Sequence, residues 1–287
     1  MSAEPTPGQG SRKLVAIFFL LAAAFAAIPL LFWGGALRRF LRESLMARWN
    51  TAYYEILCPK GTLSQGAMAE FAARREPLFL ALDKKLGDAD SDIKIRVIFD
   101  PAYSAPHDDE NRPLPYSVTK TTIRTKLIGN TPQLPFTADA EVLLAAAWGQ
   151  PGNAQIARWT ATWLVGEWRG TEIGMAAAEV ELRLGHKKVA ALLVDPGGEI
   201  ASPDDRSLLG AAWISEIAEF GGPPAVRKLY TSKMPHPNVA EVTKALGTTP
   251  VELDRKWQMW MYAYLAGMPS MPRDSSMPMD MPMTGSH

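Results

Sequence analysis

The densest group of side chains that could bind a ligand lies at the C-terminal end of the sequence, where residues 268–287 read MPSMPRDSSMPMDMPMTGSH. The candidate ligands are Met268, Met271, Met277, Met279, Met281, Met283 and the terminal His287. Thioethers are soft ligands that suit Cu(I), so the stretch predicts a copper site of low specificity. A disordered tail of biased composition explains the same pattern, and we favour that interpretation.

Outside this tail, the chain has few residues of the types used in catalysis or metal binding. The 4 histidines, at positions 107, 186, 236 and 287, are far apart in the sequence, and Cys58 is the lone cysteine. A single cysteine excludes an intrachain disulfide. The sequence also lacks a G-x-S-x-G nucleophile elbow, a phosphate-binding glycine loop and a C-x-x-C pair. We therefore interpret the histidines as surface residues rather than ligands.

The charge balance excludes a bulk attraction to nucleic acid. The 30 basic and 30 acidic residues cancel, and no polybasic stretch is interleaved with aromatic residues. With 47% hydrophobic and 21% charged residues, the chain has the composition of ordinary globular material. We expect a partner that is a membrane or another protein, and no nucleic acid.

The first structural element that the sequence predicts is a long apolar segment near the N-terminus. Leu14 to Trp33, LVAIFFLLAAAFAAIPLLFW, contains no charged or strongly polar side chain. As a helix it is roughly 30 Å long, the thickness of a bilayer's hydrocarbon core. A cleaved signal peptide is the alternative, because Arg12 and Lys13 precede the run and Ala24-Phe25-Ala26 is an acceptable cleavage site. The run is longer than a signal peptide's apolar region, which favours a retained anchor.

The charges that flank this run leave the orientation of the domain open. Arg12 and Lys13 lie on the near side. The arginines on the far side are Arg38, Arg39, Arg42 and Arg48. The positive-inside rule places the large domain in the cytoplasm, whereas long domains translocate largely regardless of charge. We favour a domain on the outer, periplasmic or extracellular, face.

Periodicity predicts a mixed α+β domain in which helices predominate. The expected organisation is a disordered tail (1–13), a transmembrane anchor (14–34), one globular domain (35–267) and a disordered Met/Pro-rich tail (268–287). Predicted helices cover 34–49, 62–76, 77–87, 138–148, 154–168, 172–184, 202–220 and 250–266; predicted strands cover 93–100 and 116–128. The run 187–195 fits a buried strand or a helical turn equally well.

Two of these helices have strong start signals. Ser202-Pro203-Asp204-Asp205 supplies an N-cap, a proline at the first helical position and an acid at the third. Thr249-Pro250-Val251-Glu252 repeats the device, and the helix it starts carries Leu253, Trp257, Trp260 and Tyr264 on one stripe. The helix that starts after Ser202 carries a corresponding apolar stripe of Leu209, Trp213, Ile217 and Phe220.

The order of the elements resembles a known plan. A helix ending in LGDADSD is followed by the strand IKIRVIFD, paired helices with WLVGE, then LLGAAWISEIAEFGG and ALGTTPVELDRKWQMWMYAYL. The most specific part is the end, where Leu246-Gly247-Thr248-Thr249, Glu252-Leu253 and Trp257 match the phrase LG-s-x-x-E-L-x-x-x-W. Over residues 75–266 the chain resembles the peptidase MA-like (gluzincin-type) domain.

The resemblance implies a zinc site that this chain lacks. The family's chemistry uses H-E-x-x-H on a helix, with two imidazoles on zinc, a glutamate as general base and a later glutamate as third ligand. The best-placed equivalent here is Ala140-Glu141-Val142-Leu143-Leu144, with the later phrase at Trp163-Leu164-Val165-Gly166-Glu167. Glu141 remains, Glu167 is displaced by one residue, and alanine and leucine cannot ligate zinc.

We therefore predict a membrane-anchored, non-catalytic relative with no cofactor. It would act as an interaction or scaffold component with a protein partner in the membrane or envelope. One alternative is a metal-dependent hydrolase that uses Glu141 and Glu167 with a scattered histidine. The other is an accessory copper-binding protein that acts through the methionine-rich tail.

Overall fold

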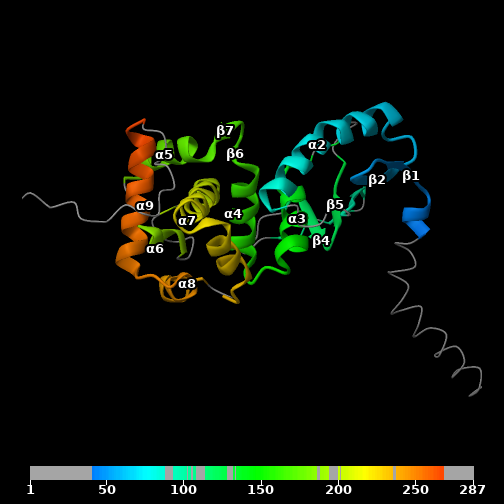
Figure 1. The fold of residues 1–287 in the computed structure, drawn as a ribbon. Helices are drawn as coiled ribbons and strands as arrows, with labels where there is room; N and C mark the ends of the chain where they lie inside the picture. Colours follow the sequence, from blue (N-terminus) through cyan, green and yellow to red (C-terminus); the bar gives the residue numbers. More distant parts are fainter. Residues whose placement is uncertain are drawn as a thin grey trace, which may run out of the picture.

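The structure is a computed structural model of a mixed α+β fold in which helices predominate. It describes residues 41–87, 93–101, 103–104, 106–107, 114–127, 132, 134–185, 188–193, 200, 202–234 and 237–267. A sheet with helices α2 (Gln65–Lys85) and α3 (Thr137–Trp148) forms one end of the molecule (Figure 1). Helices α5 (Ile173–Leu184), α6 (Val189–Leu193) and α9 (Pro250–Leu265) form the other end, with α4 (Ala154–Val165) and α7 (Pro203–Thr231) between them.

The main sheet has the strand order β1-β2-β3-β5-β4. Its strands are β1 (Met46–Asn50), β2 (Tyr54–Pro59), β3 (Ile95–Phe99), β4 (Tyr116–Thr119) and β5 (Thr122–Thr125). Strands β2, β3 and β5 are parallel, whereas the edge strands β1 and β4 are antiparallel to their neighbours. The carboxyl ends of β2, β3 and β5 therefore lie at the same end of the sheet.

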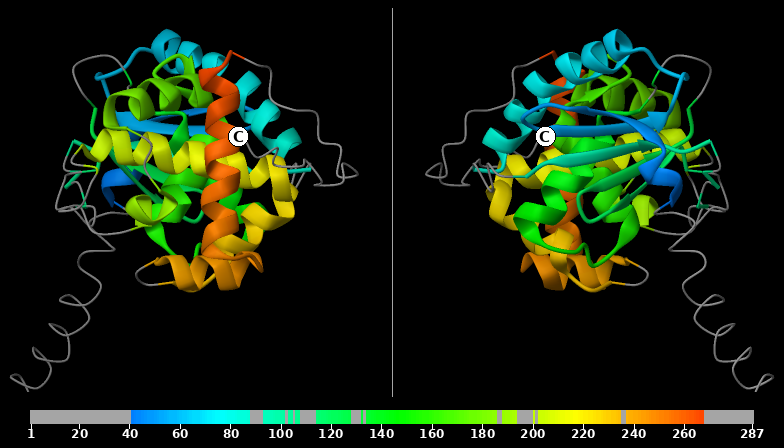
Figure 2. Two further views of the ribbon diagram at one scale, coloured as in Figure 1. Left: turned by 90° about the vertical axis from the view of Figure 1, so that its left-hand side faces the viewer. Right: turned by 90° about the vertical axis from the view of Figure 1, so that its right-hand side faces the viewer.

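The two faces of this sheet differ. The inner face, with Ile56, Val97 and Ile123, is fully buried and belongs to a core shared with helices α2 and α3. The outer face carries charged side chains around a small apolar cluster of Met46, Leu57 and Ile98. One view in Figure 2 looks onto the strands, and the opposite view looks onto α9.

The rest of the described chain is mostly helical. The helices are α2 (Gln65–Lys85), α3 (Thr137–Trp148), α4 (Ala154–Val165), α5 (Ile173–Leu184), α6 (Val189–Leu193), α7 (Pro203–Thr231), α8 (Val239–Leu246) and α9 (Pro250–Leu265). A two-stranded hairpin, β6 (Glu167–Trp168) and β7 (Thr171–Glu172), connects α4 to α5.

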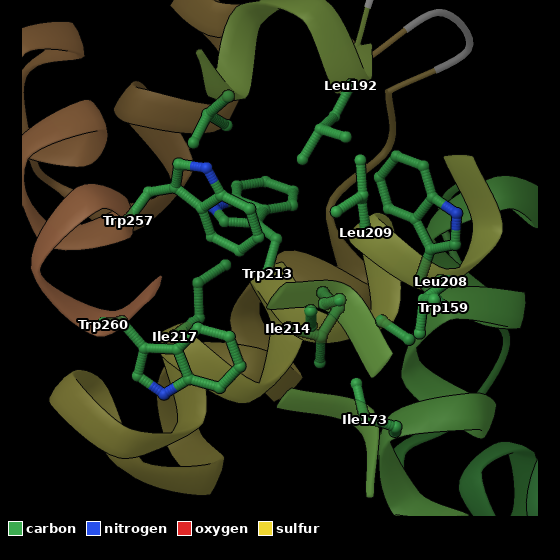
Figure 3. Packing of buried hydrophobic residues seen from close by; sticks show 14 of the residues in the cluster. Trp159, Ile173, Leu192, Leu208, Leu209, Trp213, Ile214, Ile217, Trp257 and Trp260 are labelled. Atoms are coloured by element: carbon green, nitrogen blue, oxygen red, sulfur yellow. The ribbon is translucent and has the colours of Figure 1, made fainter. Parts of the chain in front are cut away.

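A second core, rich in tryptophan, joins α4, α5, α7 and α9 (Figure 3). Helix α7 approaches α4 closely, because a Cβ at Gly210 would lie 2.1 Å from a ring carbon of Trp159. Trp159 meets Trp213 edge to face with ring centroids 6.2 Å apart. Trp257 stacks on Trp260 at 5.9 Å. Large aromatic side chains on both sides of α7 thus fix the position of this helix.

The predicted helix starts are confirmed. The Ser202 hydroxyl accepts a hydrogen bond from the backbone N–H of Asp205 at 3.3 Å, and α7 begins at the next residue. The Thr249 hydroxyl accepts one from the N–H of Glu252 at 3.2 Å, and α9 follows. Each cap satisfies a backbone donor that the first helical turn leaves unpaired.

The region after the apolar run was predicted wrongly. The helix expected over 34–49 does not reach Trp49, because Met46–Asn50 is strand β1. Residues 41–44 are helical, and residue 46 then pairs with Pro59 at the end of β2. Ladder hydrogen bonds to β2 replace the helical ones, so a long-range pairing overrides a local helical spacing.

Several other boundaries differ from the prediction. The helix expected over 202–220 extends to Thr231 as α7, with a break at Gly222, and the helix expected over 154–168 ends at Val165, before strand β6. The two helices expected at 62–76 and 77–87 are the single helix α2, which contains Pro77. The strand expected over 116–128 is the hairpin β4–β5, with Lys120 in the turn at a φ of 54°. The ambiguous run 187–195 contains a helix, Val189–Leu193.

The predicted anchor and both predicted disordered tails lie outside the described residues. Within residues 41–267, apart from the gaps given above, no helix is long and apolar enough to cross a membrane.

Candidate functional site

Residues 140–144, which the sequence comparison above aligned with a zinc-binding helix, lie in α3, and the two positions expected for ligands belong to an apolar core. Ala140 and Leu144 are fully buried. They belong to the same cluster as Ala161 and Leu164 of the neighbouring helix α4. Methyl and isobutyl groups fill the space that two imidazoles and a metal ion would need.

Glu141 belongs to a small polar group with Tyr116 and Thr137. The Tyr116 hydroxyl of β4 donates a hydrogen bond of 2.7 Å to Glu141 Oε1 and lies 3.2 Å from the Thr137 hydroxyl oxygen. Burial raises the pKa of the Glu141 carboxyl, and the Tyr116 hydrogen bond and the charge of Arg158 oppose that rise. Burial and the Glu141 charge both raise the pKa of Tyr230. The group can hold a proton, but it presents no second carboxylate.

Glu167 is in a different environment. It is exposed in β6, where its backbone pairs with that of Glu172 in β7. Arg158 of helix α4 is near Glu141. From Arg158 the helix runs on to Val165, which is roughly 10 Å further along the helix axis, and Glu167 comes after that end. The structure therefore does not bring the two predicted carboxylates together.

No metal site is present among the residues that the structure describes, since no three His, Cys, Asp or Glu side chains converge there. His107 is exposed in a loop. Cys58 is buried, with its sulfur 3.6 Å from the Met68 sulfur, and fills core space rather than a reactive site. His186, His236, His287 and the six methionines of the tail lie outside the described residues, so the copper site stays a prediction.

The sequence analysis missed a buried ion pair next to this helix. Arg75 Nη2 of α2 lies 2.6 Å from Asp139 Oδ2 of α3, and both side chains are almost fully buried. Arg75 also donates to the carbonyl oxygens of Leu134 at 2.7 Å and Pro135 at 3.0 Å. Burial raises the pKa of Asp139, and Arg75 opposes the rise. The signal in the sequence was an aspartate in the otherwise apolar stretch TADAEVLLAAAW.

A second missed group is the carboxyl of Glu216 in α7. Glu216 is 1% exposed, and its Oε2 finds no hydrogen-bond partner within the described part of the chain. Burial raises the pKa of Glu216 to about 8, with Lys256 lowering it and Glu219 and Glu252 raising it. The burial of Glu216 could have been inferred from its position on the apolar stripe of α7, one turn from Trp213.

Comparison with known protein families, with curated proteins and with solved structures found no match to this chain.

Proposed function

We propose that the protein is a membrane-anchored, non-catalytic domain built on a peptidase MA-like plan, and that it acts as an interaction or scaffold component of a membrane assembly. The anchor is the apolar run Leu14–Trp33, and the globular domain lies on the outer face of the membrane. The protein partner is a component of the same membrane or envelope.

The observation that supports this proposal most is the apolar packing of α3. A zinc peptidase of this plan needs two histidines on the buried side of the helix and a third ligand from a later segment. Here Ala140 and Leu144 pack against α4, and Glu167 is exposed in a hairpin. The plan's scaffold is kept while the groups that perform its chemistry are replaced.

One observation favours a hydrolase instead. Glu141 occupies the position of the peptidase general base, and its carboxyl has a raised pKa and a phenol as hydrogen-bond donor. A carboxyl of this kind can act as a general acid or base. No group of three His, Cys, Asp or Glu side chains that could hold a metal is found among the described residues, so we rank this function second.

The variant Glu141→Gln separates the two functions. Glutamine has the shape of glutamate and still accepts the Tyr116 hydrogen bond, so the fold should be unchanged. We expect the full chain in detergent to hydrolyse a mixed synthetic peptide library no faster than the variant does. The measurement is product formation by mass spectrometry. A wild-type rate about 100-fold or more above that of the variant would identify Glu141 as a catalytic base and contradict the proposal.

A further inference from the structure

The segment that follows the predicted anchor is fixed to the sheet by ion pairs. Glu43 accepts a hydrogen bond from Arg124 of β5, and its other carboxylate oxygen lies 3.4 Å from Arg96 of β3. Arg42 Nη1 lies 3.3 Å from Asp100 Oδ1, directly after β3. Because Glu43 has little exposure and bridges two strands, these contacts hold residues 42–43 against the outer face of the sheet.

The contacts of Arg42 and Met46 are at the carboxyl end of the parallel strands, whereas Arg96 is the second residue of β3. Met46 pairs with Pro59, the last residue of β2. The N–H of Asp100 bonds to the carbonyl oxygen of Thr125, the last residue of β5. Figure 2 shows the turn of helix 41–44 beside one end of the strands. We call this surface, formed by 41–46 and the residues that directly follow β2, β3 and β5, the anchor end of the domain.

The side chains at the anchor end suit a phospholipid surface. Leu41 and Leu45 are 52% and 68% exposed, although both are large and apolar. Arg42, Lys60 and Lys126 are exposed at the same end. Exposed leucines can enter the boundary between headgroups and acyl chains, while long basic side chains reach the phosphates. Among the described residues of this surface, the acidic side chains Glu43 and Asp100 are paired with arginines.

We propose that the anchor end lies against the headgroups of the membrane that holds the apolar run, and that Glu43 fixes the domain in this orientation. The inference rests on the anchoring part of the proposed function. The segment 34–40 reaches at most about 25 Å when extended and about 10 Å as a helix. A domain of this size is roughly 45 Å across, so the tether keeps the anchor end nearer to the bilayer than the opposite end.

The test uses the full chain in vesicles of phosphatidylcholine and phosphatidylglycerol that contain a headgroup-spin-labelled lipid. A fluorophore is attached at Ser104→Cys, exposed at the anchor end and remote in sequence from the apolar run, or at Leu182→Cys on α5. Figure 1 places α5 at the opposite end of the molecule. Cys58 is fully buried and serves as the unlabelled background. We expect lipid quenching at position 104 to exceed that at position 182 by about threefold.

A variant of Glu43 and a control variant test whether Glu43 fixes the orientation of the domain. Glu43→Gln weakens the contacts to Arg96 and Arg124, and we expect the quenching ratio to fall toward one. Glu70→Gln, an exposed carboxylate paired only loosely with Arg74 at 3.7 Å, should leave the ratio unchanged. The quenching ratio of Glu43→Gln is measured only if that variant has a native circular dichroism spectrum. If the variant does not fold, the comparison of positions 104 and 182 in the chain with Glu43 still tests the orientation.

The outcomes separate this inference from the proposed function. Equal quenching at positions 104 and 182 in membrane-integrated protein would overturn the orientation and leave the scaffold proposal intact. Release of the full chain from vesicles by alkaline carbonate would overturn the anchor and the orientation together. Stronger quenching at position 104 supports the orientation even if the domain proves to be catalytic.

Discussion

Replacing Glu216 by glutamine is expected to stabilise the protein by roughly 3 kcal/mol at pH 7 and to abolish most of the decline of stability with rising pH. Glu216 of α7 is buried, and the charges of Lys256 and Glu252 on α9 act on it. Its carboxyl must take up a proton when the chain folds at neutral pH, because burial disfavours the ionised form. Glutamine is neutral at every pH and has no such requirement.

The sign follows from the two pKa values. Burial raises the pKa of Glu216 from the ordinary 4.5 to about 8 in the folded state. Between these pH values the folded state binds one more proton than the unfolded state, so stability falls as pH rises. The stability that the protonated Glu216 carboxyl allows is fully present below about pH 4.5. Between about pH 4.5 and pH 8 the free energy of unfolding falls by about 1.4 kcal/mol per pH unit, and above about pH 8 this part of the stability is lost.

Thermal unfolding of the full chain in detergent at pH 5, 7 and 8.5 measures this effect. We expect Glu216→Gln to raise the unfolding temperature by roughly 6–12 °C at pH 7 and by much less at pH 5. The matched control is Glu179→Gln, an exposed glutamate on α5, which should follow the wild type at every pH. Parallel curves for wild type and Glu216→Gln would show that Glu216 does not titrate in this range.

Replacing Arg75 by methionine is expected to destabilise the protein by about 3–5 kcal/mol. The substitution leaves Asp139 buried without its cationic partner and removes the donors to the carbonyl oxygens of Leu134 and Pro135. Arg75 also lies over the rings of Phe71 and Phe136 at 5.0 and 4.8 Å, and methionine keeps part of that apolar contact. The loss therefore comes mainly from the orphaned carboxylate.

A double variant tests this explanation. Arg75→Met with Asp139→Ala removes both charges, so it should recover at least about half of the stability that Arg75→Met loses. Arg74→Met, one residue away and exposed, is the control and should change stability by less than about 0.5 kcal/mol. Thermal unfolding of these chains and of Asp139→Ala alone gives the coupling between Arg75 and Asp139. A double variant less stable than Arg75→Met alone would contradict the account.

Local sequence signals predicted the helices that start with a polar cap. Thr249 and Ser202 accept the expected backbone hydrogen bonds. Leu253, Trp257 and Trp260 of the predicted stripe are buried, whereas Tyr264 is only partly buried. The break in α7 is also where the sequence placed it, since Gly222 has a φ of 68°. Caps, glycine stops and apolar periodicity act within a few residues, so they can be read from one segment alone.

The first two strands could not be predicted in the same way. Strand β2 is buried on both faces, with Ile56, Leu57 and Cys58 in succession, so it shows no alternation of apolar and polar residues. Strand β1 is a short edge strand that exists because it pairs with β2. Neither strand has a strong local sequence signal of its own. The leucines before them have a helical spacing, and this spacing therefore decided the prediction.

In the candidate site too, local features were predicted from the sequence and features that depend on tertiary packing were not. The sequence predicted that Ala140 and Leu144 could not bind zinc, and the structure adds that both face a closed apolar core. It did not predict that Tyr116, from a strand, bonds to Glu141, because that contact depends on how β4 packs against α3. The burial of Glu216 likewise depends on the docking of α9, which a stripe on α7 alone does not reveal.

The most direct measurement of the central claim is the metal content of the full chain, extracted from membranes and purified without chelators. The claim is that apolar packing at Ala140 and Leu144 has replaced the zinc site of the peptidase plan. Elemental mass spectrometry should find less than about 0.1 equivalent of zinc per chain after dialysis, because no three His, Cys, Asp or Glu side chains converge in the part of the chain that the structure describes. About one equivalent of zinc that resists dialysis would contradict the claim and favour a hydrolase with ligands from other positions.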